Sequence, residues 1–210
     1  MTCDGYNPVM LTLAILAGGM SKRMGQNKAI LPFQGEVLVR RVLNRLTGLA
    51  TEAIIIAPES QEYLSLGIRV APDQIPGRGP LGGLYTALMA ASRQAVAVVA
   101  CDMPFVSADL LAYQRDILFS DMMDAVVPSS KNGLEPLHAI YRRETCLLAV
   151  RKALDAGQLR MTSWFPSAKV RILTSEETNP FDPRSLIFLN VNTPSELAQA
   201  DKLISENDGT

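Results

Sequence analysis

The strongest constraint on the fold is an unbroken apolar run at residues 95–101, with the sequence AVAVVAC. The run is short for a helix, and apolar and polar residues do not alternate in it. A strand covered on both faces has this pattern, and such strands are typical of parallel sheets that lie between two layers of helices. The run therefore predicts a parallel sheet inside an α/β fold.

Strand-like and helix-like segments alternate along the rest of the chain. Further strands are expected at residues 10–16, 53–57, 68–71, 125–128, 136–141, 170–173 and 186–189. Apolar residues recur at helical spacing in 37–49, 61–66, 81–91, 109–119, 144–156 and from 193 to about 204. This alternation predicts an α/β domain with a mostly parallel central sheet.

Local signals mark the ends of several expected helices. Ser107 is a suitable N-cap for the helix at 109–119, and Gly157 is well placed to end the helix at 144–156. The sequence Thr193-Pro194-Ser195-Glu196 reads as a capping box with proline at the first helical position, so it should open the last helix.

Length and net charge limit the number of domains and the classes of partner that are expected. The 210 residues suit one domain over 1–210, with 1–9 as an N-terminal extension and 205–210 as a disordered tail. Lys and Arg number 20 against 21 Asp and Glu, which leaves a formal charge of -1. With no global field to attract polyanions, neither nucleic acid nor membrane is expected as a partner.

The compartment and the metal chemistry are also constrained. No apolar stretch approaches the roughly 18 residues that cross a bilayer, and the polar start does not resemble a signal peptide, so we expect a cytoplasmic protein. Three cysteines without a C-x-x-C pair disfavour a disulfide framework or a zinc site. The one histidine, His138, lies in an alternating strand, and we interpret it as a packed or hydrogen-bonded side chain.

A glycine-rich segment after the first strand carries the clearest functional signal. It reads Leu16-Ala17-Gly18-Gly19-Met20-Ser21-Lys22-Arg23-Met24-Gly25-Gln26-Asn27-Lys28. Glycines let backbone N–H groups turn towards an anion, while Arg23 and Lys28 add charged donors. Open α/β sheets bind ligands at this end of a strand, so the segment predicts a triphosphate cradle. It matches neither the Walker A loop nor the dinucleotide fingerprint.

This segment resembles the signature of the molybdenum cofactor guanylyltransferases, which are nucleotidyltransferases. Four later segments resemble further blocks of the same family, in the same order: 79–84 (GPLGGL), 101–105 (CDMPF), 135–141 (EPLHAIY) and 190–194 (NVNTP). Together the five blocks cover nearly the whole chain. The resemblance implies a Rossmann-like, three-layer nucleotidyltransferase fold.

The resemblance also implies a set of site residues. Nucleotide contacts are expected from Leu16, Ala17, Gly18, Gly19, Arg23, Lys28, Asp73, Gly82 and Asp102, and catalytic roles from Arg23, Lys28 and Asp102. Asp102 directly follows the buried run, so its carboxylate should reach the same sheet edge as the glycine loop. Magnesium takes one or two protein carboxylates and completes its shell with water and phosphate oxygens, so Asp102 is the expected Mg²⁺ ligand.

Other readings stay open for three residues of this set and for two asparagines outside it. Asp102 could be an N-cap or turn residue before Pro104, and Asp73 could be an exposed turn residue beside Pro72. Gly82, which costs helix stability, could serve helix–sheet packing instead of a nucleotide. Asn190 and Asn192 should reach the same crevice as metal-shell or phosphate ligands, or could be turn residues before a capped helix.

The implied reaction transfers GMP from GTP to the terminal phosphate of molybdopterin or the molybdenum cofactor, releasing pyrophosphate. Alternatives are cytidylyl transfer to the same pterin, nucleotidyl transfer to a sugar phosphate, and a non-catalytic protein that binds GTP or hands over the cofactor. Ala17-Gly18-Gly19 favours guanine, because the cytidylyl relatives tend to have Ala-Ala-Gly there. Transient partners would be molybdopterin-handling proteins and apo-molybdoenzymes. The chain departs from the family at Asn27, where an aspartate is common.

Overall fold

The computed structural model describes residues 11–18 and 28–205. The predicted N-terminal extension (1–9) and residues 206–210 of the predicted tail lie outside the described residues. Strands β1, β4, β5, β6, β7, β9 and β10 form the central sheet in the order β10-β7-β9-β6-β1-β4-β5, and β8 pairs with β7 at its margin. Their bounds are Leu11–Leu16, Glu52–Ile56, Arg69–Ala71, Ala95–Ala100, Ala125–Ser130, His138–Arg142 and Val170–Leu173, with β8 at Gly133–Leu134.

The sheet is mostly parallel, which confirms the predicted fold class. Strand β1 is parallel to both β4 and β6, β4 to β5, and β10 to β7. Strand β9 is antiparallel to both of its neighbours, β6 and β7. The carboxyl ends of the parallel strands therefore meet at one edge of the sheet.

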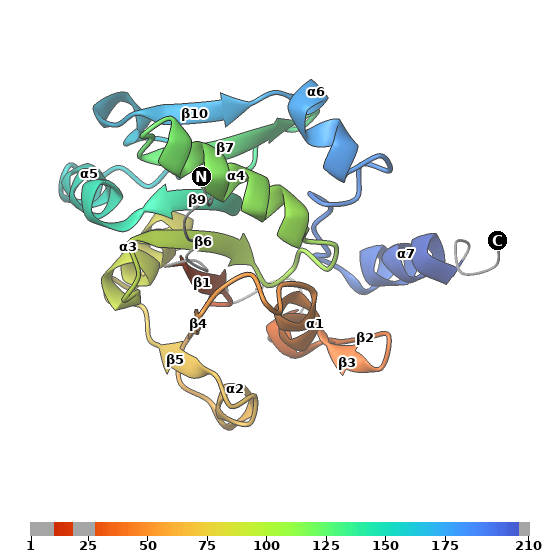
Figure 1. Cartoon of the computed structure of the whole chain (residues 1–210). Coiled ribbons are helices and arrows are strands. Elements are labelled where there is room, and N and C mark those ends of the chain that lie inside the picture. The colour runs from red at the N-terminus through yellow and green to blue at the C-terminus, as the bar shows by residue number, and fades with distance from the viewer. Residues whose placement is uncertain (1–10, 19–27, 206–210) are drawn as a thin grey trace, which may run out of the picture.

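Helices cover both faces of the sheet and make three layers (Figure 1). The helices are α1 (Leu38–Arg45), α2 (Gln61–Leu64), α3 (Gly79–Ala90), α4 (Ala108–Ser120), α5 (Arg143–Asp155), α6 (Ser175–Thr178) and α7 (Pro194–Ser205). Leu13 and Ile15 of β1 belong to the core beneath α1 and α4, whereas Ala14 belongs to the core beneath α3 and α5. Because both faces are buried, β6 needs the unbroken apolar run that the sequence shows.

Two predicted helix ends are confirmed. The Ser107 hydroxyl accepts a hydrogen bond from the Leu110 amide at 3.2 Å, at the start of α4. Gly157 has a φ of 75°, and its amide donates to the Leu154 carbonyl at 3.0 Å, at the end of α5. A left-handed residue ends a helix in this way, and glycine adopts that conformation without strain.

The strand predicted at 186–189 is wrong, because this segment is a turn. The buried Asp182 carboxylate accepts the amides of Leu186 at 2.7 Å and of Ile187 at 3.1 Å. These two amides are therefore not available to a neighbouring strand. The strand predicted at 136–141 begins later, at His138, and ends at Arg142.

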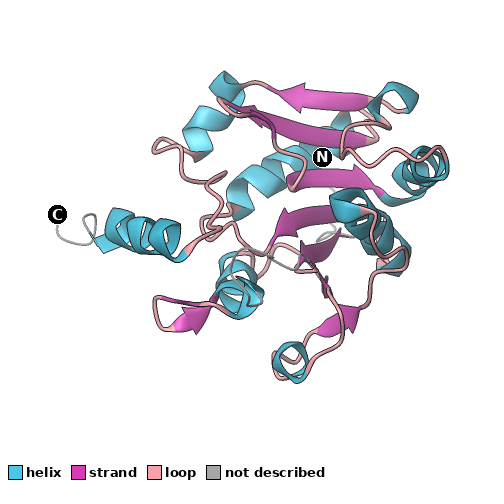
Figure 2. Ribbon diagram, turned by 180° about the vertical axis from the view of Figure 1, so that it is seen from behind, coloured by secondary structure: helices cyan, strands magenta, loops and turns pink. Residues whose placement is uncertain are grey.

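The sequence patterns did not predict a small β-hairpin that lies beside the sheet. A hairpin of β2 (Pro32–Phe33) and β3 (Glu36–Val37) turns through Gln34 and Gly35, which have φ values of 51° and 80°. Consecutive positive φ values suit the turn of a two-residue hairpin. Phe33 packs in a separate cluster with Leu38, Phe105, Val191 and Ala200, which attaches α7 to the hairpin. Figure 2 shows α7 projecting to one side of the sheet.

Among the described residues, the longest apolar helices fall short of what a bilayer crossing requires.

Candidate functional site

A cavity of about 630 Å³ lies at the carboxyl ends of the parallel strands. Its walls are residues 16–18 at the end of β1, 56–58 at the end of β4, 72–73 after β5 and 100–102 at the end of β6. The first turn of α3 closes it from one side through Gly79, Pro80 and Gly83. The site therefore forms where separate chain segments leave the same sheet edge, as is usual for ligand sites in open α/β folds.

The structure brings six of the predicted site residues together in this cavity: Leu16, Ala17, Gly18, Lys28, Asp73 and Asp102. Gly19 and Arg23, and also Asn27, lie outside the described residues, so their predicted roles are neither supported nor opposed. Wall residues such as Pro58 and Leu137 were missed. They carry no chemical signal in the sequence and line the cavity only through the position of their strands.

Backbone hydrogen bonds hold the start of the glycine-rich loop against its neighbours. The Ala17 amide donates to the Ile56 carbonyl at 2.9 Å, and the Cys101 amide donates to the Leu16 carbonyl at 3.1 Å. The buried Tyr63 hydroxyl donates to the Ala17 carbonyl at 3.2 Å. The chain is thus fixed to both adjacent strands at the point where the loop begins.

Lys28 and Asp102 face each other as an ion pair in the cavity. The Lys28 ammonium lies 3.7 Å from the Asp102 carboxylate and donates to the Asn192 side-chain oxygen at 2.6 Å. The Val191 amide donates to the Asp102 carbonyl at 2.8 Å, which brings the 190–192 segment against the end of β6. Burial raises the pKa of the Asp102 carboxyl, Lys28 opposes this shift, and Glu196 adds to it. A cation would stabilise the ionised carboxylate here.

The start of α7 supports Asn192. The Thr193 hydroxyl accepts the Glu196 amide at 3.1 Å, which is one half of the predicted capping box. The Glu196 carboxylate, however, accepts the amide of Asn192 at 2.5 Å. Glu196 therefore holds the residue that contacts Lys28, one position before the expected cap.

The two asparagines of the 190–194 block have different positions. Asn192 reaches Lys28, as expected for the shared crevice. Asn190 is exposed and lines a separate cavity, next to the 182–189 loop.

Asp73 is both a turn residue and part of the cavity wall. Its carboxylate accepts the Ile75 amide at 3.1 Å and the Thr86 hydroxyl at 2.9 Å, so it holds a turn against α3. It also lines the cavity. A contact to the nucleoside is therefore compatible with its structural role and stays a prediction.

The paired glycines at the start of α3 permit close packing. A Cβ atom on Gly82 would lie 3.0 Å from the Arg78 Cβ atom and 3.1 Å from the Ile75 carbonyl oxygen. A Cβ atom on Gly83 would lie 3.2 Å from a methyl carbon of Leu16. Gly83 lines the cavity, and Gly82 sits behind it against the 73–78 loop. The packing reading thus has direct support, while a nucleotide contact by Gly82 stays a prediction.

His138 is a buried structural residue, which confirms its interpretation. Its Nε2 atom accepts the Ser107 amide at 3.2 Å, and its ring meets the Phe188 ring edge-on at 5.6 Å between centroids. Burial lowers the pKa of His138 to about 4, so the imidazole is neutral near pH 7.

The donor set at the cavity suits a hard cation with few protein ligands. Within residues 11–18 and 28–205, no cluster of three or more His, Cys, Asp or Glu side chains could hold a metal ion. Asp102 offers one carboxylate, and magnesium commonly takes one or two protein carboxylates with water and phosphate oxygens. Asp102 therefore fits a magnesium ion that arrives with a triphosphate.

Sequence comparison identifies relatives over nearly the whole chain. Residues 13–169 match the family described as the MobA-like NTP transferase domain. A probable molybdenum cofactor guanylyltransferase from Pelotomaculum thermopropionicum is 38% identical over 199 residues, which cover 95% of each chain. The molybdenum cofactor guanylyltransferase from Desulfosudis oleivorans is 32% identical over 92% of this chain and 96% of its own.

Solved structures agree on the fold. Molybdopterin-guanine dinucleotide biosynthesis protein A from Archaeoglobus fulgidus has a TM-score of 0.79 and 24% identity, over 93% of this chain and 99% of its own. The 2-C-methyl-D-erythritol 4-phosphate cytidylyltransferase from Thermus thermophilus has a TM-score of 0.66 and 17% identity, over 91% and 98% of the two chains. The chain therefore belongs to the MobA-like NTP transferase family, among the molybdenum cofactor guanylyltransferases.

Proposed function

We propose that this protein transfers GMP from GTP to the terminal phosphate of molybdopterin or the molybdenum cofactor, giving the guanine dinucleotide and pyrophosphate. The observation that carries the proposal is the cavity at the strand ends, where the start of the glycine-rich loop, Lys28 and Asp102 meet. Positive charge and a carboxylate for a metal ion suit a triphosphate, and relatives of this chain over nearly its whole length are named for the reaction.

The chemistry needs no general base. A phosphate monoester has a second pKa of about 6 and is mostly a dianion near pH 7. One of its oxygens attacks the α-phosphorus of GTP, the bond from that phosphorus to the bridging oxygen breaks, and pyrophosphate leaves with the electron pair. The obstacle is repulsion between two polyanions, so alignment and neutralisation of charge supply the catalysis.

The residues of the cavity divide these tasks. Lys28, which Asn192 holds by a hydrogen bond, neutralises phosphoryl oxygens, and Arg23 is proposed to act with it. Asp102 would hold Mg²⁺, which supplies positive charge to the triphosphate when bound. Leu16 to Gly19, Asp73 and Gly82 are proposed to position the nucleotide.

The proposal keeps two expectations that rest on composition and on the family. The reaction takes place in the cytoplasm. The product is delivered through transient contacts with apo-molybdoenzymes, and the acceptor arrives from molybdopterin-handling proteins.

The test is an anaerobic assay of pyrophosphate release. Purified protein is incubated with Mg²⁺, one nucleoside triphosphate and one acceptor, either molybdopterin or a sugar phosphate. We expect turnover with GTP and molybdopterin together. Turnover only with CTP, or only with a sugar phosphate, would overturn the proposal. Binding of GTP without turnover would indicate a handover protein.

A further inference from the structure

The segment that begins with Asp102 is held in place by side chains of α1. Residues 102–106 form turns between β6 and α4. The Arg41 Nε atom donates to the Pro104 carbonyl at 3.2 Å. Arg45, one turn later on α1, donates to the next two carbonyls, at 3.5 Å and 2.8 Å. One helix therefore fixes three consecutive carbonyls beside the candidate metal ligand.

Arg41 also contacts the segment that carries Lys28. This segment continues through the β2–β3 hairpin into α1. The Arg41 guanidinium lies over the Phe33 ring, 4.9 Å from its centroid, and 3.9 Å from the Glu36 carboxylate. The Phe33 ring in turn meets the Phe105 ring edge-on, at 6.4 Å between centroids. Arg41 therefore joins the segment that carries Lys28 to the turns that follow β6.

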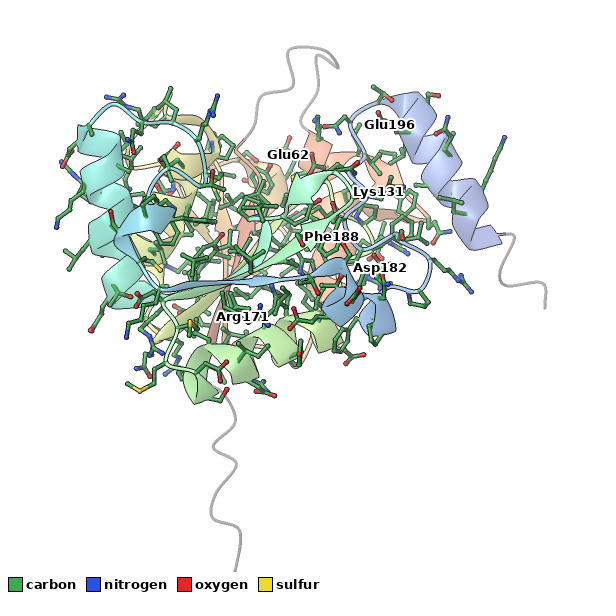
Figure 3. All side chains as sticks on the ribbon, turned by 90° about the horizontal axis from the view of Figure 1, so that it is seen from above. Glu62, Lys131, Arg171, Asp182, Phe188 and Glu196 are labelled. Atoms are coloured by element: carbon green, nitrogen blue, oxygen red, sulfur yellow. The ribbon has the colours of Figure 1, made fainter. Side chains whose placement is uncertain are left out.

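A small apolar cluster joins the same segments. Its buried members come from the hairpin, the start of α1, the 102–106 turns and the α7 region: Phe33, Leu38, Phe105, Val191 and Ala200. Figure 3 labels Glu196 near the start of α7, and this helix reaches the cluster through Ala200. Lys28 and its two partners, Asp102 and Asn192, thus stand on three segments that meet in one cluster.

Two arginines one turn apart on α1 repel each other, so this pair needs a reason beyond helix stability. The Arg41 side chain is only 15% exposed, and desolvation of a guanidinium costs free energy unless acceptors surround it. Partial burial and the charge of Arg41 both lower the pKa of Arg45. The acceptors that offset these costs are the carbonyls at 104–106. The contacts therefore favour one conformation of the turns that begin with Asp102.

We infer that Arg41 is a positioning residue for nucleotidyl transfer, which fixes the spacing of the Lys28 ammonium and the Asp102 carboxylate by joining the segments that carry them. This inference rests on the proposed function. Within the described part of the chain, the walls of the nucleotide cavity do not include Arg41, so its effect passes through the two residues that it positions. A misplacement of about 1 Å can slow a reaction by about 100-fold, so such support matters for the rate.

The test measures two quantities under anaerobic conditions. One is the dissociation constant of GTP with Mg²⁺, by calorimetry, and the other is pyrophosphate release with GTP and molybdopterin. Arg41→Met keeps the apolar stem but removes the charge and the donors. We expect it to weaken GTP binding by about fivefold and to lower the turnover rate by about tenfold. Arg41→Lys keeps a cation and a donor group, so both losses should be smaller.

A double-mutant cycle on GTP binding separates positioning from general support of the fold. The spacing between two groups has no effect once one of them is absent. Arg41→Met should therefore change the dissociation constant by less than about twofold in a Lys28→Ala background. An equal loss in both backgrounds would mean that Arg41 only supports the fold, and would overturn the inference.

Arg69→Met is the matched control. Arg69 lies 3.4 Å from the Glu52 carboxylate and donates to the Ala90 carbonyl at 2.9 Å, so it makes contacts of the same kind at the opposite edge of the sheet. Both measured quantities should stay within about twofold of the wild type.

Melting temperatures show whether Arg41→Met folds. If it does not, Phe33→Leu takes its place in the cycle, because it removes the ring beneath the guanidinium and keeps an apolar side chain in the cluster. We expect Phe33→Leu to weaken GTP binding by about threefold, and by less than about 1.5-fold in the Lys28→Ala background.

The failures of the two proposals can be separated. If the wild type turns over and both Arg41 variants keep its GTP affinity and its rate, the positioning role alone is overturned. If the wild type binds GTP without turnover, the proposed reaction falls, while a non-additive cycle still supports the positioning role. A wild type that binds no GTP overturns both.

Discussion

The two cavities share one sheet edge but are built in different ways. The first is made of strand ends, so its walls are backbone and small or apolar side chains, with Lys28, Asp73 and Asp102 as its charged groups. The second is made of a hairpin, a short helix and a loop, and its walls are mostly polar side chains. Backbone amides suit phosphates of any nucleotide, whereas polar side chains can recognise one particular ring. The difference shows that one sheet edge can carry cavities with walls of opposite character, according to whether strand ends or loops build them.

The largest effect should come from removing the Asp102 carboxylate of the first cavity. We expect Asp102→Ala to lower the turnover rate by about 100- to 1,000-fold, because the triphosphate loses its metal ligand. Pyrophosphate release measures the rate, and Asp155→Asn on the surface of α5 is the control. Full activity in Asp102→Ala would remove the metal assignment.

The buried imidazole of His138 should make stability depend on pH. His138 contacts Phe188, and its pKa of about 4 in the folded protein lies below the usual 6.5. Between pH 4 and pH 6.5 the unfolded chain binds more protons than the folded protein. The stabilisation by the buried neutral ring is therefore complete above pH 6.5 and is lost as the pH falls towards 4. This group should contribute about 3 kcal/mol to the free energy of unfolding over that range.

Urea denaturation of the wild type and of His138→Gln at pH 7 and pH 4.5 measures this contribution. Glutamine does not titrate, so the variant should lose less stability on acidification than the wild type. Equal losses in the two proteins would show that His138 is not buried as a neutral ring.

A matched pair of substitutions compares the two cavities directly. Asn192→Ala removes the hydrogen bond to Lys28 and should lower the turnover rate by about tenfold. Asn190 lines the other cavity, so Asn190→Ala, two residues away, should change the rate by less than about twofold. Steady-state kinetics with each substrate varied in turn separates these outcomes. Identical kinetic profiles for the two variants would mean that the segment acts as one unit and that the division into two cavities is wrong.

The smallest effect is expected at Glu196, which holds the Asn192 amide. Glu196→Ala removes this bond and should lower the turnover rate by about threefold to fivefold. Glu196→Gln retains an acceptor oxygen and should recover most of the rate. If glutamine is as slow as alanine, the charge of Glu196 matters more than its hydrogen bond.

Sequence reasoning worked best where a residue's position follows from its strand. Asp102 directly follows the buried run of β6, and its place at the sheet edge could be predicted because parallel strands end together. Sequence reasoning was weaker for Gly82 and Gly83, since neighbouring glycines look alike in the sequence. Only the packing of α3 shows that Gly83 faces the cavity and Gly82 the loop behind it.

The strand expected at 186–189 shows where a local pattern misleads. The segment is apolar enough for a strand, but the carboxylate of Asp182 takes up two of its amides. The resulting turn places Phe188 and Asn190 in the wall of the second cavity. This contact could not be read from the hydrophobic pattern.

The amino-acid sequence by itself determined the α/β class, the family and six of the residues that line the first cavity. These follow from short-range patterns: which runs are apolar on both sides and which residues come directly after a strand. Only the tertiary structure decided that Glu196 holds Asn192, that Asn192 holds Lys28, and that the second cavity exists. Both depend on side chains that are distant in sequence, and hydrophobic periodicity carries no information about which turns meet.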